Sequence, residues 1–367
     1  MKFNTGIIDA HVHAHGGCTV DGFLKNSLDH ISAAGIDKEN LLCVKHGRSA
    51  CLTEAPALLA KVLYPEKFSV LGNPTFMIPE FGVDAAGGAA QVQDFIDAGI
   101  DGVKMADANT DGRPLDHQLF DNMFSVLEKE GAPIIYHVGT YALSPYKRTF
   151  AKNHNHVENP PFLTYQAGID DDKPEIWNEE FQKANIKKWS ELENILTKHP
   201  DLHFIAPHML CHADNLDDLS GIMDRHPNLC LDITPCDQIY YYFSKDTEHA
   251  KDFIETYQDR ILFGTDNTIE LDPFYTIALM RAILETDETI FSVNWGFDIK
   301  GLNLPKEILS KIYRDNYLRL FPEKPINKER AAKYCEKLYD IVRNQTETPA
   351  DNLAEALECA KRIREAI

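Results

Sequence analysis

The sequence lacks several features that would assign a protein class at once. Its eight cysteines are scattered over 367 residues without a C-x-x-C pair, which argues against a disulfide scaffold or a cysteine-based zinc site. No apolar run approaches the ~18 residues of a membrane-spanning helix, and the first residues lack the basic and apolar regions of a secretion signal. We therefore expect a protein of the reducing cytoplasm that does not enter a membrane.

Positive charge is also scarce. The chain has 37 Lys and Arg against 57 Asp and Glu, a net charge of −20. Nucleic acid is excluded as a partner because a phosphate backbone requires clustered Lys and Arg. A small-molecule substrate is expected instead. No G-x-G-x-x-G follows the first predicted strand, which argues against a dinucleotide-binding fold.

A strand–helix pattern recurs along the chain. Polar helical segments end at a turn with Pro or Gly, and a short β-rich run follows each of them. Repeated alternation of this kind predicts right-handed crossovers and a parallel sheet. Eight repeats favour a closed (β/α)₈ TIM barrel over an open doubly wound sheet, and we assign it to residues 1–321. The candidate strands lie within residues 7–13, 40–47, 63–76, 97–106, 128–139, 197–209, 224–235 and 259–267.

Two segments interrupt the rhythm. Residues 140–175 form a long, proline-containing loop after the fifth strand, and we expect a lid over the site. Residues 322–367 are predicted to form a C-terminal helical extension packed on the barrel or on a partner subunit. Its apolar stripe consists of Ala356, Cys359, Ala360 and Ile363. The extension and the acidic surface are compatible with a homodimer.

Histidine and aspartate recur at the ends of the predicted strands. His11 and His13 are two apart on the first strand and therefore share one face. That pair is a weak signal alone, but His137, His208 and Asp266 end the fifth, sixth and eighth strands. Because the carboxyl ends of parallel barrel strands converge at one end, these groups predict one metal site. Imidazole and carboxylate ligands suit Zn²⁺, Mn²⁺ or Fe²⁺.

These motifs resemble those of the amidohydrolase superfamily. The resemblance is to the amidohydrolase-related branch that includes aminocarboxymuconate-semialdehyde decarboxylase, and it covers about residues 7–321. The sixth-strand motif departs from the branch by reading PHMLCH, and the last by reading GTDNT. The matching stretches are IDAHVH (8–13), GVKM (102–105), PIIYHVG (133–139), HFIAPHM (203–209), LDITP (231–235), RILFGTDN (260–267) and IYRDNYLRLF (312–321).

The resemblance also implies a ligand set for one divalent transition metal. Its members would be His11, His13, His137 and Asp266. Zn²⁺ is our first choice and Mn²⁺ or Fe²⁺ the alternatives. His208 would lie beside the metal as a catalytic histidine, or bind a second metal as in binuclear relatives.

Lys104 raises the question of a second metal. In binuclear relatives a lysine on the fourth strand is carboxylated and bridges two metals. We prefer one metal and a free Lys104 ammonium that pairs with a substrate carboxylate or a barrel acid, because the mononuclear branch matches better.

Our first functional hypothesis is a metal-dependent hydrolase. It would cleave a C–N or C–O bond of an amide, lactone or ester in a small polar metabolite through a metal-activated water. His208 is the preferred base and Asp266 the alternative. A barrel that binds metal and ligand without turnover is disfavoured by the complete ligand set.

The alternative hypothesis is a non-oxidative, metal-dependent decarboxylase or hydratase acting on an unsaturated or aromatic carboxylic acid. A decarboxylase needs a cation near the leaving carboxylate. Lys104, Arg113, Arg148 and Lys45 are the candidates for that cation, and Tyr240 is a further candidate for the pocket wall.

Overall fold

The computed structural model describes residues 6–15, 19–44, 52–75, 85–106, 112–139, 174–292, 297–343 and 350–366. Arg148 and Lys45 lie outside these ranges, as does most of the predicted lid.

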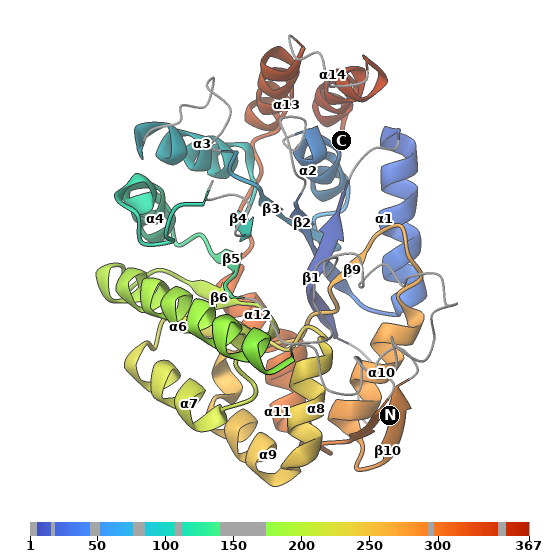
Figure 1. The fold of residues 1–367 in the computed structure, drawn as a ribbon. Coiled ribbons are helices and arrows are strands. Elements are labelled where there is room, and N and C mark those ends of the chain that lie inside the picture. Colours follow the sequence, from blue (N-terminus) through green and yellow to red (C-terminus); the bar gives the residue numbers. More distant parts are fainter. Residues whose placement is uncertain are drawn as a thin grey trace.

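Nine parallel strands in the described part of the chain form one sheet in sequence order, seen end-on in Figure 1. The eighth barrel strand is split in two. Its first half pairs with the seventh strand and its second half with the first, which closes the barrel. The strands are β1 (Ile8–Ala14), β2 (Lys38–Cys43), β3 (Phe68–Gly72), β4 (Gly102–Ala106), β5 (Ile134–His137), β6 (Phe204–Ala206), β7 (Leu229–Asp232), β8 (Ile261–Leu262) and β9 (Asn267–Thr268).

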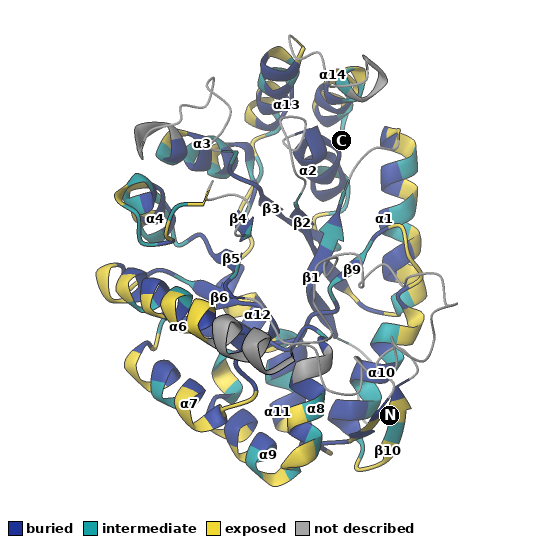
Figure 2. Ribbon diagram, in the orientation of Figure 1, coloured by how far each residue is buried: buried dark blue, intermediate teal, exposed yellow. Residues whose placement is uncertain are grey.

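Helices surround the barrel, and their buried faces turn toward the strands (Figure 2). The helices are α1 (Val20–Ala34), α2 (Glu54–Leu63), α3 (Ala85–Ala98), α4 (Asp121–Glu130), α6 (Pro174–Lys198), α7 (Leu216–Arg225), α8 (Asp237–Lys245), α9 (Thr247–Thr256), α10 (Phe274–Glu285), α11 (Lys306–Ser310), α12 (Asn316–Leu320), α13 (Lys328–Val342) and α14 (Ala350–Glu365). Short helical turns are η4 (Gln118–Phe120), η6 (His208–Cys211), η7 (Gln258–Arg260) and η8 (Lys311–Asp315). Among the described residues, no helix has the length and apolar character needed to span a membrane.

Local chemistry explains where these helices begin and end. The Thr19 side chain accepts a hydrogen bond from Gly22 N at the start of α1, and Gly35 ends that helix in the left-handed region at φ 63°. Gly131 ends α4 in the same way at φ 58°. These two turns lead from α1 into β2 and from α4 into β5.

Two apolar layers hold the barrel together. The larger layer lies between the strands and the surrounding helices. The smaller layer fills the barrel interior, because alternate side chains of a strand point inward. Tyr317, Leu320 and Phe321 cover one end of this inner layer, and the polar residues described below line the other. The inner strand residues are Ile8, Ala10, Leu42, Leu71, Ile135, Ile205, Cys230 and Leu262.

The C-terminal helices pack on the outside of the barrel. In the described residues α14 contacts α2 and α1, while α13 contacts α3 and α2. Ala356, Cys359, Ala360 and Ile363 are at most 1% exposed, so the stripe read from the sequence faces inward. The domain boundary at residue 321 and the homodimer stay predictions.

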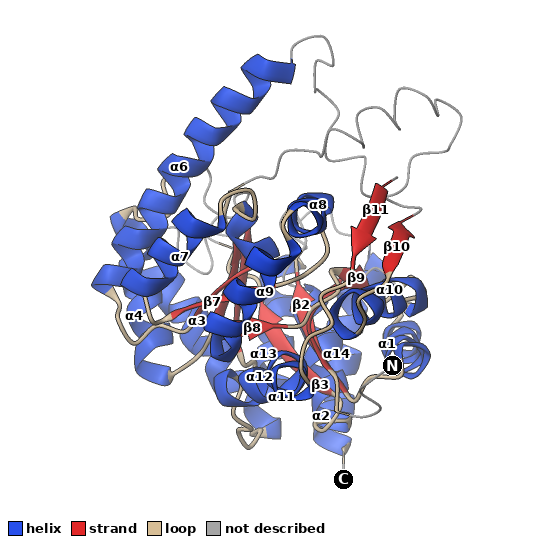
Figure 3. Ribbon diagram, turned by 90° about the horizontal axis from the view of Figure 1, so that it is seen from below, coloured by secondary structure: helices blue, strands red, loops and turns tan. Residues whose placement is uncertain are grey.

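A two-stranded antiparallel sheet was not anticipated from the sequence. It consists of β10 (Thr289–Ser292) and β11 (Phe297–Lys300) and stands apart from the barrel strands in Figure 3. The same view shows α6, the 25-residue helix after the predicted lid, extending beyond the other helices.

Candidate metal centre

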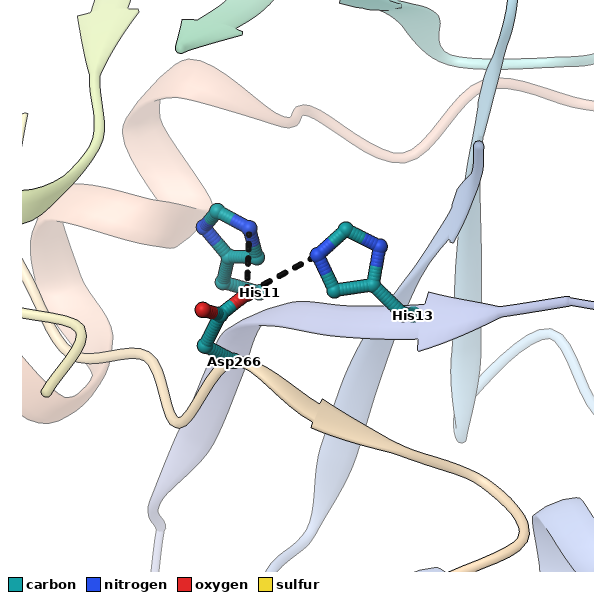
Figure 4. A group of neighbouring side chains, drawn as sticks. All are labelled: His11, His13 and Asp266. Atoms are coloured by element: carbon teal, nitrogen blue, oxygen red, sulfur yellow. Dashed lines mark hydrogen bonds and ion pairs between the residues drawn. The ribbon is translucent and has the colours of Figure 1, made fainter. Parts of the chain in front are cut away.

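Three of the predicted ligands form a compact group (Figure 4). Ligand atoms of His11, His13 and Asp266 all lie within 4.8 Å of one another. Asp266 Oδ1 is 2.8 Å from His13 Nε2 and 3.3 Å from His11 Nε2. Two imidazole nitrogens and a carboxylate oxygen that converge on one point are a suitable ligand set for a divalent transition metal.

The backbone around Asp266 brings its carboxylate to β1. Asp266 N donates to His11 O at 2.9 Å, and the residue has a left-handed φ of 57°, which Asp tolerates better than most residues. Gly264 permits the segment between β8 and β9 to lie close to β1 and to the segment after β7. A Cβ there would lie 2.8 Å from His11 Cβ and 2.6 Å from Thr234 Cγ2. The Gly-Thr-Asp sequence is therefore suited to this junction.

The protonation states of the group also suit a metal. Burial lowers the pKa of His11 to about 4 and lowers the pKa of His13. Burial opposes ionisation of Asp266, but the hydrogen bond from His13 and the two neighbouring imidazoles hold its pKa well below the usual range. Neutral imidazoles and an ionised carboxylate are the forms that bind metal. The proton shared by His13 and Asp266 is the one that a metal would replace.

Asp232, at the end of β7, is a site residue that sequence reasoning missed. Its fully buried carboxylate accepts from His11 Nδ1 at 2.8 Å and from His208 N at 2.9 Å. Burial opposes its ionisation, but His11 brings the pKa of Asp232 down to about 2. With its proton on Nδ1, His11 turns the Nε2 lone pair toward Asp266. Its position at a strand end, like that of Asp266, was the available signal.

His208 lies on an unusual left-handed turn. Four consecutive non-glycine residues, His208 to Cys211, have φ values between 53° and 58°. Each such residue costs roughly 1–2 kcal/mol relative to right-handed backbone. The bond from His208 N to Asp232 and the one from Trp189 Nε1 to Leu210 O, 3.1 Å, oppose that strain. Thus the PHMLCH departure coincides with a backbone that fixes His208.

The His208 imidazole faces the group of three. Its Nε2 is 3.8 Å from Asp266 Oδ2, and its ring centroid is 5.9 Å from that of His11. Its Nδ1 lies 3.2 Å from Thr234 O and 3.1 Å from Thr234 Oγ1. The side chain is therefore held from behind, with Nε2 toward the candidate metal position.

His137 stands beside the group rather than within it. Its ring lies edge-on to that of His208 at 5.1 Å, and its Nε2 is 4.0 Å from Cys211 Sγ. Burial, followed by the nearby His208 and Lys104, brings the pKa of His137 well below its ordinary value. The imidazole is thus neutral, as a ligand must be, but its metal-binding role stays a prediction.

Lys104 reaches the same site from β4. Its Nζ lies 3.1 Å from His11 Nε2, and the side chain is 3% exposed. Burial lowers the pKa of Lys104 to about 8, while Asp266 and Asp232 oppose the shift. Because His11 keeps its proton on Nδ1, Nε2 can accept from the Lys104 ammonium. A bound metal would take this lone pair and leave the Lys104 ammonium to another acceptor.

The roles of the remaining candidates stay predictions. Arg113 is half-buried in the segment before η4. Tyr240 is fully buried, and its hydroxyl donates to Ile233 O at 2.6 Å. Arg148 lies outside the described residues.

Comparison with known proteins places this barrel in a class. The fold and the partly buried His–Asp group are those expected of a metal-dependent TIM-barrel enzyme. The family described as Amidohydrolase matches residues 69–322, more than half of the chain, and the chain belongs to this family. The match begins after His11 and His13, so it does not itself cover that pair. No curated protein matched the chain.

The chain matches three solved structures with this fold over nearly the whole length of each of them. A TIM-barrel protein from Bordetella bronchiseptica is 19% identical, with a TM-score of 0.51 over 86% of this chain and 97% of that one. 5-Carboxyvanillate decarboxylase from Novosphingobium aromaticivorans, complexed with manganese and 4-hydroxy-3-methoxy-5-nitrobenzoic acid, is 15% identical, with a TM-score of 0.54 over 87% and 96%. 2,6-Dihydroxybenzoate decarboxylase from Rhizobium is 16% identical, with a TM-score of 0.50 over 86% and 98%.

These neighbours correct the first functional hypothesis. The sequence-based preference for a hydrolase of amides, lactones or esters is wrong, because the neighbours named by a reaction are mostly decarboxylases. The misjudgement has a physical source. The same metal ligands serve both reactions, so the ligand motifs carried no information about which bond is broken.

Proposed function

We propose that this protein is a metal-dependent, non-oxidative decarboxylase of an unsaturated or aromatic carboxylic acid. The observation that carries the proposal is the buried ammonium of Lys104, 3.1 Å from His11 Nε2 in the candidate metal centre. A substrate carboxylate that leaves water for a buried site loses several kcal/mol of solvation unless a cation receives it. Lys104 supplies that cation. The reactions named for the structural neighbours agree with this choice.

The proposed cofactor is one divalent transition metal. His11, His13 and Asp266 would hold it, joined by His137 as the family resemblance implies. When bound, such a metal acts as a Lewis acid that orients and polarises substrate oxygens. The ligand set accepts Zn²⁺ and Mn²⁺ alike, and one neighbour was solved with manganese. Elemental analysis should find about one metal per chain, whereas two would favour a carboxylated Lys104.

The proposed acid is His208. Decarboxylation breaks the bond between the carboxylate carbon and its neighbour, releases CO₂ and leaves an electron pair on that neighbour. The carbon must then receive a proton, so that R–CO₂⁻ and H⁺ become R–H and CO₂. The His208 imidazole is suited to deliver it, since Nε2 faces the centre while the rest of the ring is held by Thr234. Asp266, already ionised beside His13, is better suited to bind the metal.

Detection of CO₂ from a panel of hydroxylated benzoic acids and unsaturated acids tests the proposal. Reaction in D₂O should place one deuterium on the carbon that lost CO₂. His208→Ala should keep its metal and lose about 10²–10⁴-fold in rate. His199→Ala is the matched control, since His199 is equally buried but bonds Glu128 away from the site. Hydrolysis of an ester or amide without CO₂ release from any acid would contradict the proposal.

A further inference from the structure

The first strand carries an irregularity that decides where its histidines point. In the pairing of β1 with β2, Asp9 is opposite Glu39, but Val12 is opposite Leu41. Two residues of β1, Ala10 and His11, therefore stand opposite one residue of β2. This is a β-bulge, which inserts one extra residue and shifts the alternation of side chains by one.

The bulge is required for the candidate metal site. Ile8 and Ala10 belong to the inner apolar layer, so regular alternation would turn the next odd-numbered side chains outward. His11 and His13 nevertheless converge with Asp266. Only the extra residue between Asp9 and Val12 lets Ala10 and both imidazoles share the inner face.

The Asp9 carboxylate connects this bulge to the segment that carries Asp266. Asp9 Oδ1 accepts from His11 N at 3.0 Å and from Thr265 N at 3.1 Å, and Oδ2 accepts from Thr265 Oγ1 at 2.6 Å. Thr265 directly precedes Asp266. Asp9 thus joins the backbone of a ligand on β1 to the backbone that carries the ligand after β8, and the side chain is fully buried.

The other bulged residue, Ala10, also has a side chain as the hydrogen-bond partner of its backbone. Asn40, the residue of β2 opposite the bulge, donates from Nδ2 to Ala10 O at 3.1 Å. A bulge leaves backbone groups outside the regular ladder, and such groups need partners when buried. Asp9, on β1 itself, and Asn40, on β2, provide these partners.

We propose that Asp9 is a positioning residue for the metal centre: its carboxylate holds the bulge that aims His11 and His13 inward and keeps Asp266 opposite them. The inference rests on the metal site of the proposed function. It makes metal affinity depend on a side chain that touches neither metal nor substrate.

Neighbouring Glu39 offers a matched control. It pairs in register with Asp9 and is equally buried. Its carboxylate accepts from His30 Nδ1 at 2.7 Å, and His30 lies on α1, away from the ligand-bearing backbone. Glu39→Ala should therefore destabilise the fold as a buried carboxylate deletion does, without displacing a ligand.

The experiment titrates metal-free protein with Co²⁺ and records its visible absorption, together with thermal unfolding before metal is added. Asp9→Ala should weaken Co²⁺ binding about tenfold or more and alter the spectrum. Asp9→Asn should stay within about threefold, because an amide oxygen can accept both backbone N–H groups while its NH₂ donates to Thr265 Oγ1. Glu39→Ala should lower the unfolding temperature and leave affinity and spectrum as in the wild type.

Equal Co²⁺ affinity in Asp9→Ala and the wild type would overturn the positioning role, as would an equal loss in Glu39→Ala. Absence of metal binding by the wild type would instead refute the proposed function and the inference with it. Should Asp9→Ala fail to fold, Thr265→Val removes the bond to Asp9 Oδ2 and the longer one from Asn267 N, 3.3 Å, while the bond from Thr265 N to Asp9 Oδ1 remains. A smaller loss of affinity with an altered spectrum is then expected, and wild-type behaviour would contradict the proposal.

Discussion

Replacement of Asp232 by asparagine should weaken metal binding, because it removes the acceptor that selects the His11 tautomer. Asp232 Oδ2 accepts from His11 Nδ1, while Oδ1 accepts from His208 N at 2.9 Å and Thr234 N at 3.1 Å. An amide has only one acceptor oxygen. It can serve either His11 or the two backbone donors, but not both.

Both orientations of the amide carry a penalty. If its oxygen keeps the backbone donors, its NH₂ faces His11 Nδ1 and favours the tautomer with the proton on Nε2, the ligand atom. If the amide flips, Thr234 N loses its acceptor and His208 N keeps only Thr234 Oγ1 at 3.3 Å, and a buried donor left without an acceptor costs about 1–3 kcal/mol. Loss of such an outer partner weakens metal binding about 10–100-fold, which corresponds to about 1.4–2.8 kcal/mol.

Competition between metal-free Asp232→Asn and a chromophoric chelator for Zn²⁺ measures this loss. Glu128→Gln is the control, since Glu128 also accepts from a histidine, His199 Nδ1 at 3.1 Å, but away from the site. Wild-type Zn²⁺ affinity in Asp232→Asn would refute the assignment of Asp232 as the residue that orients His11.

Further predictions concern Lys104, His137 and Glu54. Lys104→Met should retain about one metal per chain but raise KM for the acid substrate at least tenfold. An unchanged KM would refute the role of Lys104 as the carboxylate partner. His137→Ala should lower the metal content measured by elemental analysis, and full occupancy would remove His137 from the ligand set. Burial raises the pKa of Glu54 from 4.5 to about 8, where it bonds Tyr334 and Asn73 N. The unfolded chain releases this proton near pH 4.5 and the folded protein near pH 8, so the free energy of unfolding falls as pH rises between them. Glu54→Gln should flatten that decline in thermal unfolding measured from about pH 5 to 8, and an unchanged slope would contradict the shift.

The barrel could be predicted because its signals are local. Alternation of β-rich runs and helical segments, with turns of Pro or Gly between them, is written in short stretches of sequence. His11, His13 and Asp266 could be grouped because parallel strands deliver their carboxyl ends to one place. The two-stranded sheet of β10 and β11 escaped notice because it interrupts the strand–helix rhythm.

The chemistry around the ligands was less accessible to sequence reasoning. Asp232 stood in a matching motif, yet nothing in LDITP tells that its carboxylate spans from His11 to the backbone of His208. The left-handed turn at PHMLCH is equally hidden, because non-glycine residues adopt it only where surrounding contacts outweigh its strain. The reaction was misjudged because shared metal ligands do not distinguish hydrolysis from decarboxylation.

The sequence by itself determined the fold class and the kind of atoms at the candidate metal site, since periodicity and residue type are properties of the chain. Only the tertiary structure decided how His11 and His13 come to face inward. That depends on a bulge defined by pairing with β2 and held by Asp9 and Asn40. A register shift between two strands exists only once both strands are in place, and a single-residue shift reverses the direction of every side chain that follows.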